Sequence, residues 1–420
     1  MNAYPRRRVV LLLASLGCLC GTPVLGGGLY ITEFGQPSMG TSAAGATVLA
    51  EDASTGVANP AGIFLLDSDN EWMVNAMLVS PSAKFRSEAG TTIPGNNGGD
   101  AGVNAVGGSL FHARKLSDKW ALGAGVNSIS AAALDYGAGF VGRHWVDEID
   151  LLTVTGTVNL AYLVNEAFSV AVGVPMMFGS LDMDVAIPPL QGPVTPDRDG
   201  LARISDGEDF SATLSLAALW QVNERLRLGL TYLGENELSF DSDLEITLPG
   251  RGAATTVGNI GVDVEIPFAQ TVIFSTAQDF GNHLTMLASV HWEDWSTVDN
   301  LLISTNRLGA ALPRDWEDTW KLALGLRWRT GDAWTYYTGV AYDSSPTSAE
   351  QRTADMPIDR QVRISAGATY RLSQRTTIGS ALTYADFGNA RISNTNGGGT
   401  VVGDYSTNRI IFAGFNVNWK

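Results

Sequence analysis

The sequence predicts an all-β fold: a 14-stranded antiparallel transmembrane β-barrel with an N-terminal plug segment inside its lumen. Three observations support this prediction. The chain opens with a pattern typical of a secretory signal, most of the remainder consists of period-two segments, and the connections between these segments alternate between short and long.

Residues 1–26 have the features of a secretory signal peptide. Three arginines at positions 6–8 precede an apolar run over 9–19 that is too short to span a bilayer. Both cysteines of the chain, Cys18 and Cys20, lie in this stretch. The mature chain therefore has no thiol, which excludes disulfides, zinc–thiolate sites and a catalytic cysteine.

The composition of the chain leaves two broad classes of protein. The formal net charge is −16, which argues against nucleic acid as a partner. No segment after the signal approaches the roughly 20 consecutive apolar residues of a membrane helix. With 45% hydrophobic residues and 47 glycines, the chain is either a soluble periplasmic or secreted β protein or an outer-membrane barrel.

Fourteen segments after residue 69 show the apolar–polar alternation of a half-buried strand. Their lengths suit tilted strands that cross a membrane, and an even number is typical of bacterial barrels. The predicted strands are 71–80, 103–113, 119–130, 150–163, 167–177, 210–222, 226–240, 267–279, 284–295, 319–329, 334–343, 361–371, 376–386 and 409–419.

The connections between the predicted strands alternate strictly in length. Every second connection is a short turn, such as "NEA" or "SQR", and the others are long and rich in Gly, Pro, Asp and Asn. This is the layout of an outer-membrane barrel, with periplasmic turns and extracellular loops. The alternative, a soluble β-sandwich, would distribute its loop lengths without this rhythm.

The last predicted strand, "RIIFAGFNVNWK", indicates which face meets lipid. Apolar residues from Ile411 to Trp419 alternate with Asn416 and Asn418, so we assign the apolar face to lipid and the asparagines to the lumen. Aromatic residues recur near strand ends, where their rings suit the two membrane–water interfaces. These residues are Trp72, Trp120, Tyr162, Trp220, Trp292, Trp295, Trp328 and Tyr384.

Residues 27–69 precede the first strand and are rich in Ala and Gly. A barrel of this strand number encloses a lumen too wide for its own side chains to fill, so we expect this segment to plug it, with 70–420 as the barrel. A rigid turn closes the segment, because proline restricts both itself and the preceding residue. The alternative is a disordered leader. The turn consists of Asn59, Pro60, Ala61 and Gly62.

The stretch "GLYITEFGQPSMGTSAAGATVLAEDASTGVANPAGIFLLD" contains a Glu, a Gly-rich run, an Ala-Glu-Asp-Ala element and an Asn-Pro-Ala element in that order. In this it resembles the N-terminal hatch of FadL-type outer-membrane transporters (the OmpP1/FadL/TodX family). Where that family has an early aromatic residue, this chain has Leu29. The barrel stretches "IPFAQTVIFSTAQDFGNHLTMLASVHWEDWSTV" and 318–372 are similar to the family as well.

This resemblance implies a function at the bacterial outer membrane. In the family, hydrophobic substrates dock among extracellular loops, move to a lumenal pocket and leave sideways through a gap at a kink in the third strand. We therefore expect passive uptake of long-chain fatty acids by a monomer surrounded by outer-membrane lipid, with no cofactor. Aromatic hydrocarbons or other neutral hydrophobic solutes are the alternative substrates.

The resemblance also places three residues in the lumenal pocket: Leu29, Arg314 and Asp343. Asp343 matches an acidic position of the family, and Arg314 lies near, but not on, a basic one. The family's second pocket base has no counterpart here. Because a buried carboxylate is costly without a cation, this departure keeps neutral solutes open as substrates.

Two further groups of residues are candidates for steps along the path. Gly123 and Gly125 in the third strand would weaken strand pairing and permit the lateral gap, or would only ease packing in the wall. The segment after the fifth strand is apolar, and we expect an extracellular loop that docks substrate or packs on itself. Its candidate residues are Met176, Met177, Phe178, Leu181 and Met183.

Three other functions compete with transport of hydrophobic compounds. An enzyme would need a nucleophile or metal motif, and the sequence has neither a Gly-x-Ser-x-Gly elbow nor a His-Glu-x-x-His helix. A general porin would lack the plug. A structural or adhesive barrel would take up no lipid. Acidic loop clusters are more typical of solvation than of calcium binding, so we expect no metal site.

Overall fold

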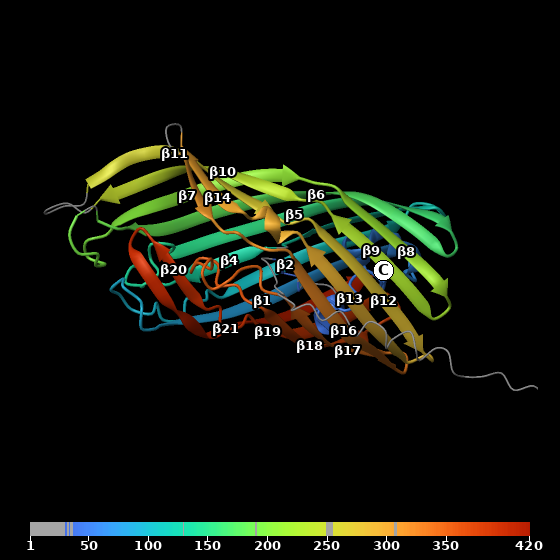
Figure 1. Cartoon of the computed structure of the whole chain (residues 1–420). Coiled ribbons are helices and arrows are strands. Elements are labelled where there is room, and N and C mark those ends of the chain that lie inside the picture. Colours follow the sequence, from blue (N-terminus) through green and yellow to red (C-terminus); the bar gives the residue numbers. More distant parts are fainter. Residues whose placement is uncertain are drawn as a thin grey trace, which may run out of the picture.

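The structure of the protein is a computed structural model that describes residues 30, 31, 33, 37–128, 130–189, 191–248, 255–305 and 309–420. The expected signal peptide and Leu29 lie outside the described residues. Figure 1 shows strands running side by side along one long axis, with short turns at one end and longer extensions at the other. Within the described part, no helix has the length and apolar character needed to cross a membrane.

The helices and strands have the following bounds: η1 Pro37–Thr41, α1 Thr55–Ala58, η2 Pro60–Leu65, β1 Asn70–Ser87, β2 Ala105–Lys115, β3 Trp120–Asn127, β4 Ala131–Asp135, β5 Glu148–Asn165, β6 Phe168–Ile187, β7 Gly200–Ala212, β8 Ser215–Asn223, β9 Leu226–Leu233, β10 Asn236–Leu248, β11 Thr255–Phe268, β12 Thr271–Phe280, β13 Leu284–Glu293, η3 Trp295–Thr297, β14 Asn300–Thr305, β15 Gly309–Pro313, β16 Thr319–Thr330, β17 Trp334–Asp343, β18 Gln361–Arg371, β19 Thr376–Asp386, β20 Ile392–Asn396 and β21 Gly399–Trp419.

The strands close into one antiparallel ring. The last strand, β21, pairs with β1 from Trp72–Trp419 to Ser87–Gly403, so the ring closes between its first and last strands. Several neighbouring segments, such as β7 with β8 and β9 with β10, are halves of one interrupted strand. Counted in this way the described segments occupy fourteen positions, and the predicted 14-stranded antiparallel barrel is confirmed.

Strand β16 shows how the wall separates two environments. Leu322 and Leu324 point outward and are 54% and 62% exposed, whereas Lys321 and Ala323 between them are buried on the inner side. The same alternation in β21 turns Asn418 inward. Apolar side chains thus face lipid, and polar ones face the lumen. Trp295, predicted for a membrane interface, is instead fully buried in the interior core next to Tyr30.

Several strands continue beyond their predicted ends on the side with the long connections. Strand β1 runs to Ser87 rather than residue 80, and β6 runs to Ile187 rather than 177. The predicted loop after the fifth strand is therefore wrong over residues 178–187, because those residues pair along β5 and β7, whereas their role in docking stays a prediction. The barrel wall continues where the sequence composition resembles a loop.

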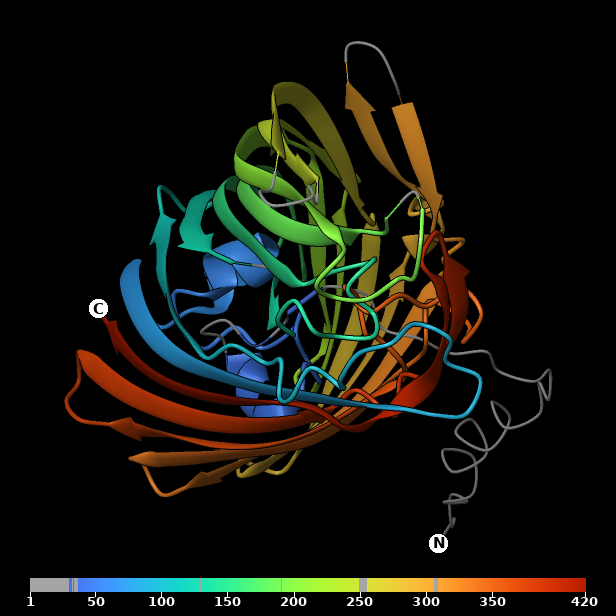
Figure 2. The same cartoon turned by 90° about the vertical axis from the view of Figure 1, so that its left-hand side faces the viewer.

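The N-terminal segment 37–66 lies within the ring of strands, where Figure 2 shows its short helices. Its carbonyl groups accept hydrogen bonds from inward-facing side chains: Asn159 Nδ2 binds Gly56 O at 2.8 Å, and Ser169 Oγ binds Ala61 O at 2.7 Å. On the opposite side, Ser42 contacts β17 and β18. Contacts with both sides of the wall place this segment across the lumen.

Loops and strand extensions fill the other end of the barrel with an apolar core. Phe85 packs edge-on against Phe140 and Tyr405 there. Tyr136 stacks on Phe140 and shares a hydrogen bond with the Tyr405 hydroxyl. The segment 344–360 between β17 and β18 packs Met356 and Ile358 into this core. Apolar side chains therefore fill this end of the barrel above the lumen.

Candidate functional site

The wall of the barrel has an opening at its third strand. This strand is interrupted between Asn127, where β3 ends, and Ala131, where β4 begins. Among the described residues, the β2 segment 105–109 pairs only with β1, and β4 pairs with β5 but not with β2. The opening is closed on one side by the pair Leu110–Val126 and on the other by the bridge Gly102–Leu134.

An apolar cavity of roughly 370 Å³, which we call the wall cavity, extends through this opening. Leu134, Met356 and Phe412 line it from the inside of the barrel. It is also lined by Val106 and Leu152, which face outward and are 82% and 47% exposed. The lumen and the lipid-facing surface therefore share one apolar surface at this point.

Gly123 and Gly125 lie beside the opening but do not form it. Both are paired on both sides, with β2 and with β5, so strand pairing is intact at these positions. A side chain at Gly123 would instead collide with the backbone of Gly56 in α1. These contacts favour the second reading of the two glycines, that they ease packing, because their small size permits the close approach of the N-terminal segment. A role in the lateral gap stays a prediction.

A second cavity of roughly 200 Å³, the lumenal cavity, lies against the N-terminal segment. Ala46, Val57 and Pro60 line it from this segment. Strands β5, β6, β8, β12 and β13 supply the opposite walls. Tyr30, Ile31 and Asn127 line both cavities, so the two cavities adjoin. Tyr30 also bridges Ser130 at the strand break.

A buried cluster of five charged residues lies in this part of the lumen. Asp343 Oδ2 is 3.1 Å from Lys321 Nζ and 2.9 Å from Arg363 Nη1. Lys321 also contacts Glu293 at 3.5 Å, and Arg363 Nε contacts Glu33 at 2.9 Å. Three carboxylates therefore surround two cations.

The structure separates the predicted pocket residues. Asp343 lies in this charged cluster, whereas Arg314 forms a bidentate pair with Asp355 at 2.5 and 3.1 Å and also contacts Thr353. Arg314 is thus bound to a carboxylate of the segment 344–360 and not to the charged cluster of Asp343, and its role toward a substrate stays a prediction. Leu29 lies outside the described residues.

Sequence reasoning missed the charged residues that do accompany Asp343. Lys321 lies between Trp320 and Leu322, and Arg363 lies between Val362 and Ile364. A charge flanked by apolar residues on a membrane strand must face the lumen, because the neighbouring positions face lipid. The alternation of charged and apolar residues could therefore have identified Lys321 and Arg363 as facing the lumen. The same argument applies to His291 and Glu293.

Glu51 ties the N-terminal segment to the wall. Its carboxylate contacts Arg327, lies 3.3 Å from Arg329 Nη2 and accepts a 2.5 Å hydrogen bond from Tyr337. Burial alone would raise the pKa of Glu51, but these arginines and Tyr337 lower it to about 2. The neighbouring Asp52 has no cation partner, and burial raises its pKa to about 7 despite two hydrogen bonds from Ser54.

The predicted turn Asn59–Gly62 adopts a compact, capped geometry. The Asn59 side chain accepts from Ala61 N at 3.1 Å and starts η2, with Pro60 at the first helical position. Its amide also donates to Thr47 O at 2.7 Å and to Ala218 O at 3.0 Å. One side chain therefore links two parts of the N-terminal segment to the wall.

The predicted docking residues divide between the two faces of β6. Met177, Leu181 and Met183 point inward and pack into the apolar core of the extended end. Phe178 is 41% exposed on the outer face, and Met176 is half-buried. A strand alternates its side chains, so these residues do not form one surface.

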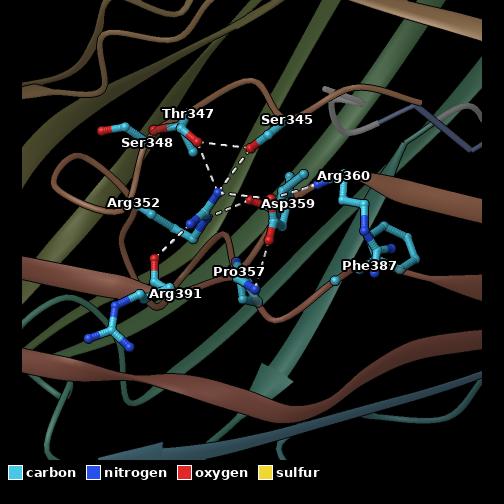
Figure 3. A network of polar contacts seen from close by, with 12 residues as sticks. Ser345, Thr347, Ser348, Arg352, Pro357, Asp359, Arg360, Phe387 and Arg391 are labelled. Atoms are coloured by element: carbon cyan, nitrogen blue, oxygen red, sulfur yellow. Dashed lines mark hydrogen bonds and ion pairs between the residues drawn. The ribbon is translucent and has the colours of Figure 1, made fainter. Parts of the chain in front are cut away.

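Arg352 organises the segment 344–360. Its guanidinium donates to Ile358 O and Arg391 O at 2.6 Å each and to Thr347 O at 2.9 Å. Figure 3 shows this side chain at the centre of the network, with Asp359 at 3.5 Å. Met356, which this segment carries, lines the wall cavity. Arg352 thereby fixes the segment that carries Met356 and so holds one side of the wall cavity in place.

Comparisons with known proteins agree with this architecture. The family model described as "Outer membrane protein transport protein (OMPP1/FadL/TodX)" matches residues 17–419. The long-chain fatty acid transport protein of Escherichia coli O6:H1 is 22% identical over 406 residues, covering 89% of this chain and 90% of the relative. Outer membrane protein P1 of Haemophilus influenzae is 22% identical, covering 87% of each chain.

Solved structures show the same fold. A Pseudomonas aeruginosa FadL homologue superposes with a TM-score of 0.85 at 19% identity, covering 94% of this chain and 99% of that one. The toluene transporter TodX of P. putida superposes with a TM-score of 0.69 at 16% identity, covering 95% and 99%. The matched family model spans nearly the whole chain, and the chain therefore belongs to the OMPP1/FadL/TodX family of bacterial outer-membrane transport proteins.

Proposed function

We propose that the protein takes up hydrophobic compounds, foremost long-chain fatty acids, by passive diffusion from the extracellular side. One observation carries this proposal: an apolar cavity joins the lumen to the lipid-facing surface through an interrupted strand. Long-chain fatty acid transport is the function that the Escherichia coli relative's name gives it. A monomer closes its own ring, so the opening would face outer-membrane lipid directly.

The substrate would follow a continuous apolar route. It would enter through the apolar core at the extended end, reach the lumenal cavity and pass Tyr30 and Ile31 into the wall cavity. Each methylene kept out of water contributes about 0.8 kcal/mol, so an acyl chain favours this route over an aqueous one. The N-terminal segment would act as a hatch that bars the aqueous route to the periplasm.

A neutral hydrocarbon is the second candidate substrate. Among the described residues that line the lumenal cavity there is no Lys or Arg. A toluene transporter shares the fold. Uptake of toluene would support this candidate.

The lateral exit can be tested by filling the opening. Ala132 lines the wall cavity, so Ala132→Trp should obstruct it and reduce uptake of labelled oleate to the level of cells without the protein. Ala124 lies on β3, paired on both sides and outside both cavities, so Ala124→Trp is the matched control. Unchanged uptake by Ala132→Trp in a correctly folded barrel would refute lateral exit.

A further inference from the structure

We propose that the lumenal cavity receives the substrate head group in a neutral, hydrogen-bonding form, such as a protonated carboxylic acid or an alcohol, rather than as a carboxylate. This inference rests on the proposed uptake function and specifies its substrate chemistry. It depends on which polar atoms line the cavity and on where the nearby cations are bound.

Several buried polar side chains line this cavity without a hydrogen-bond partner in the described structure. His291 is 1% exposed, and neither ring nitrogen has a partner of good hydrogen-bond geometry, although the Ala43 backbone interacts with the ring. Thr47 Oγ1, Asn127 Oδ1 and Thr155 Oγ1 are likewise buried and unbonded. A polar atom that is buried without a partner is energetically costly, so a ligand that bonds to it is favoured.

These atoms converge on the cavity from different sides. Asn127 and Thr155 are cross-strand partners on β3 and β5. His291 lies on β13, and Thr47 belongs to the N-terminal segment. All four are neutral groups or, for histidine, a group that can be neutral. Together they offer donors and acceptors suited to a hydroxyl or a protonated carboxyl group.

The charges around the cavity disfavour an anion. Glu293 lines the cavity, and its carboxylate accepts a 2.7 Å hydrogen bond from Trp295 Nε1. The cations nearest to His291 are Lys321, its cross-strand neighbour on β16, and Arg363 on β18. Both are bound in the charged cluster, where carboxylates outnumber cations three to two.

A carboxylate entering this cavity would therefore meet Glu293 without a cation of its own. Burying an unpaired anion is costly, and the like charge adds repulsion. The remaining titratable groups among the described lining residues are Tyr30, whose hydroxyl donates to Ala269 O at 2.5 Å, and Tyr232, whose hydroxyl donates to Gln270 Oε1 at 3.0 Å. A protonated acid or an alcohol avoids both costs and can donate its hydrogen to Glu293 or His291.

The test compares an acid with its alcohol in the full-length protein. Binding of oleic acid and oleyl alcohol is measured by calorimetry in the same detergent at about pH 5 and about pH 8. In a detergent micelle the apolar surroundings raise the pKa of the fatty acid above the ordinary carboxyl value of about 4.3, so the acid is more protonated at the lower pH and ionised at the higher one. We expect the alcohol to bind equally at both pH values. Oleic acid should bind at least tenfold more weakly at about pH 8 than at about pH 5, a difference of about 1.4 kcal/mol in binding free energy.

Three variants assign the effect to this cavity. Glu293→Gln should strengthen oleate binding at the higher pH, because it removes the opposing charge and releases Lys321 from that pair. His291→Leu and Thr155→Val should weaken the alcohol at both pH values. Glu350→Gln, at a fully exposed position in the segment 344–360, is the matched control. It should change neither the binding of oleate nor the binding of the alcohol.

The outcomes separate this inference from the proposed function. Oleate that binds equally at both pH values and is indifferent to Glu293→Gln would overturn the neutral-form inference while leaving uptake of fatty acids intact. Failure of both ligands to bind at either pH would overturn the proposed function itself. If His291→Leu does not fold, as judged by heat-modifiable migration on gels, Thr155→Val alone decides the role of the polar atoms.

Discussion

Single side chains hold the N-terminal segment against the barrel wall, and two adjacent acids do so in opposite ways. Glu51 is ionised between Arg327 and Tyr337, whereas Asp52 is buried without a cation. The first stabilises docking of the segment through its charge, and the second only when it is protonated. Docking should therefore respond both to mutation and to pH.

Glu51→Gln should loosen the segment. Removing one partner of a buried ion pair costs about 3–5 kcal/mol, because the remaining charge stays buried. The cost of Glu51→Gln should lie toward the lower end of this range, since Arg327 keeps its contacts with Asp279 and Thr285. Chymotrypsin cleavage within 37–66, which contains Leu49 and Phe64, should accelerate. Asp184→Asn, which breaks the exposed pair with Arg203, is the control, and a similar acceleration there would contradict the assignment.

Asp52 should make docking weaker as pH rises. Its pKa in the folded protein is about 7, above the ordinary value of 3.8, so the docked state binds the proton more tightly than the undocked one. The stabilisation is present at low pH and is lost as pH rises from about 4 through 7. Hydrogen exchange of 47–58, corrected for intrinsic rates, should speed up toward pH 8. Asp52→Asn should abolish this trend, and a trend that survives would exclude Asp52 as its source.

At this scale the sequence located some site residues and missed their partners. Asp343 was placed in the lumen by family resemblance, and it does lie in the buried charged cluster. Arg314 was grouped with it, yet it pairs with Asp355, which follows in a long connection. Partner choice depends on how that connection folds back, and a period-two pattern carries no such information.

Close packing between elements is the next scale, and glycines in the wall make it possible. A side chain at Gly339 on β17 would collide with the Thr41 carbonyl oxygen in η1. Gly123 plays the same part on β3 against α1. The small residues of 37–62 pack against these wall glycines. Because neither side has large side chains, the two backbones approach closely.

Gly339→Ala should displace the first turn of the N-terminal segment. We expect intermittent ion conductance in planar bilayers, because a gap would open along the wall. Gly156→Ala on β5 is the matched control, since an added methyl group there meets nothing within 4 Å. Equal conductance of the two variants would show that the contact is not needed for closure.

The sequence located strand positions well and strand ends poorly. The alternation that predicts 361–371 coincides with β18, because both faces of that strand meet the environments that the pattern encodes. Beyond the membrane the outer face meets water, so alternation fades while strand pairing continues, as in β6. The break between Asn127 and Ala131 likewise left no composition signal.

For the whole molecule, the central expectation is that the N-terminal segment blocks the lumen of the closed barrel. Deleting 28–58 should leave the fourteen-position ring intact, because β1 pairs with β2 and β21 without help from that segment. We expect the full-length protein to be silent in planar bilayers and the deletion variant to conduct steadily. A full-length protein that conducts as well as the deletion variant would identify a general porin.

The terminal lysine shows how the ring closes at its seam. Lys420 follows the last strand, and its ammonium lies 3.5 Å from the buried Glu71 and 3.3 Å from Asp67. Glu71 also accepts a 3.0 Å hydrogen bond from Asn418. The positive charge of Lys420 thus compensates the buried carboxylate of Glu71 in the first strand.

By itself, the sequence determined the barrel, its strand number and the small-residue segment ahead of it. These follow from local periodicity and composition, since each strand must present one face to lipid and the other to the lumen. Only the tertiary structure decided where the wall opens, which carboxylates hold Lys321 and Arg363, and which polar atoms of the lumenal cavity stay unbonded. Those features arise between residues far apart in the chain, where packing and charge pairing, rather than local pattern, determine the outcome.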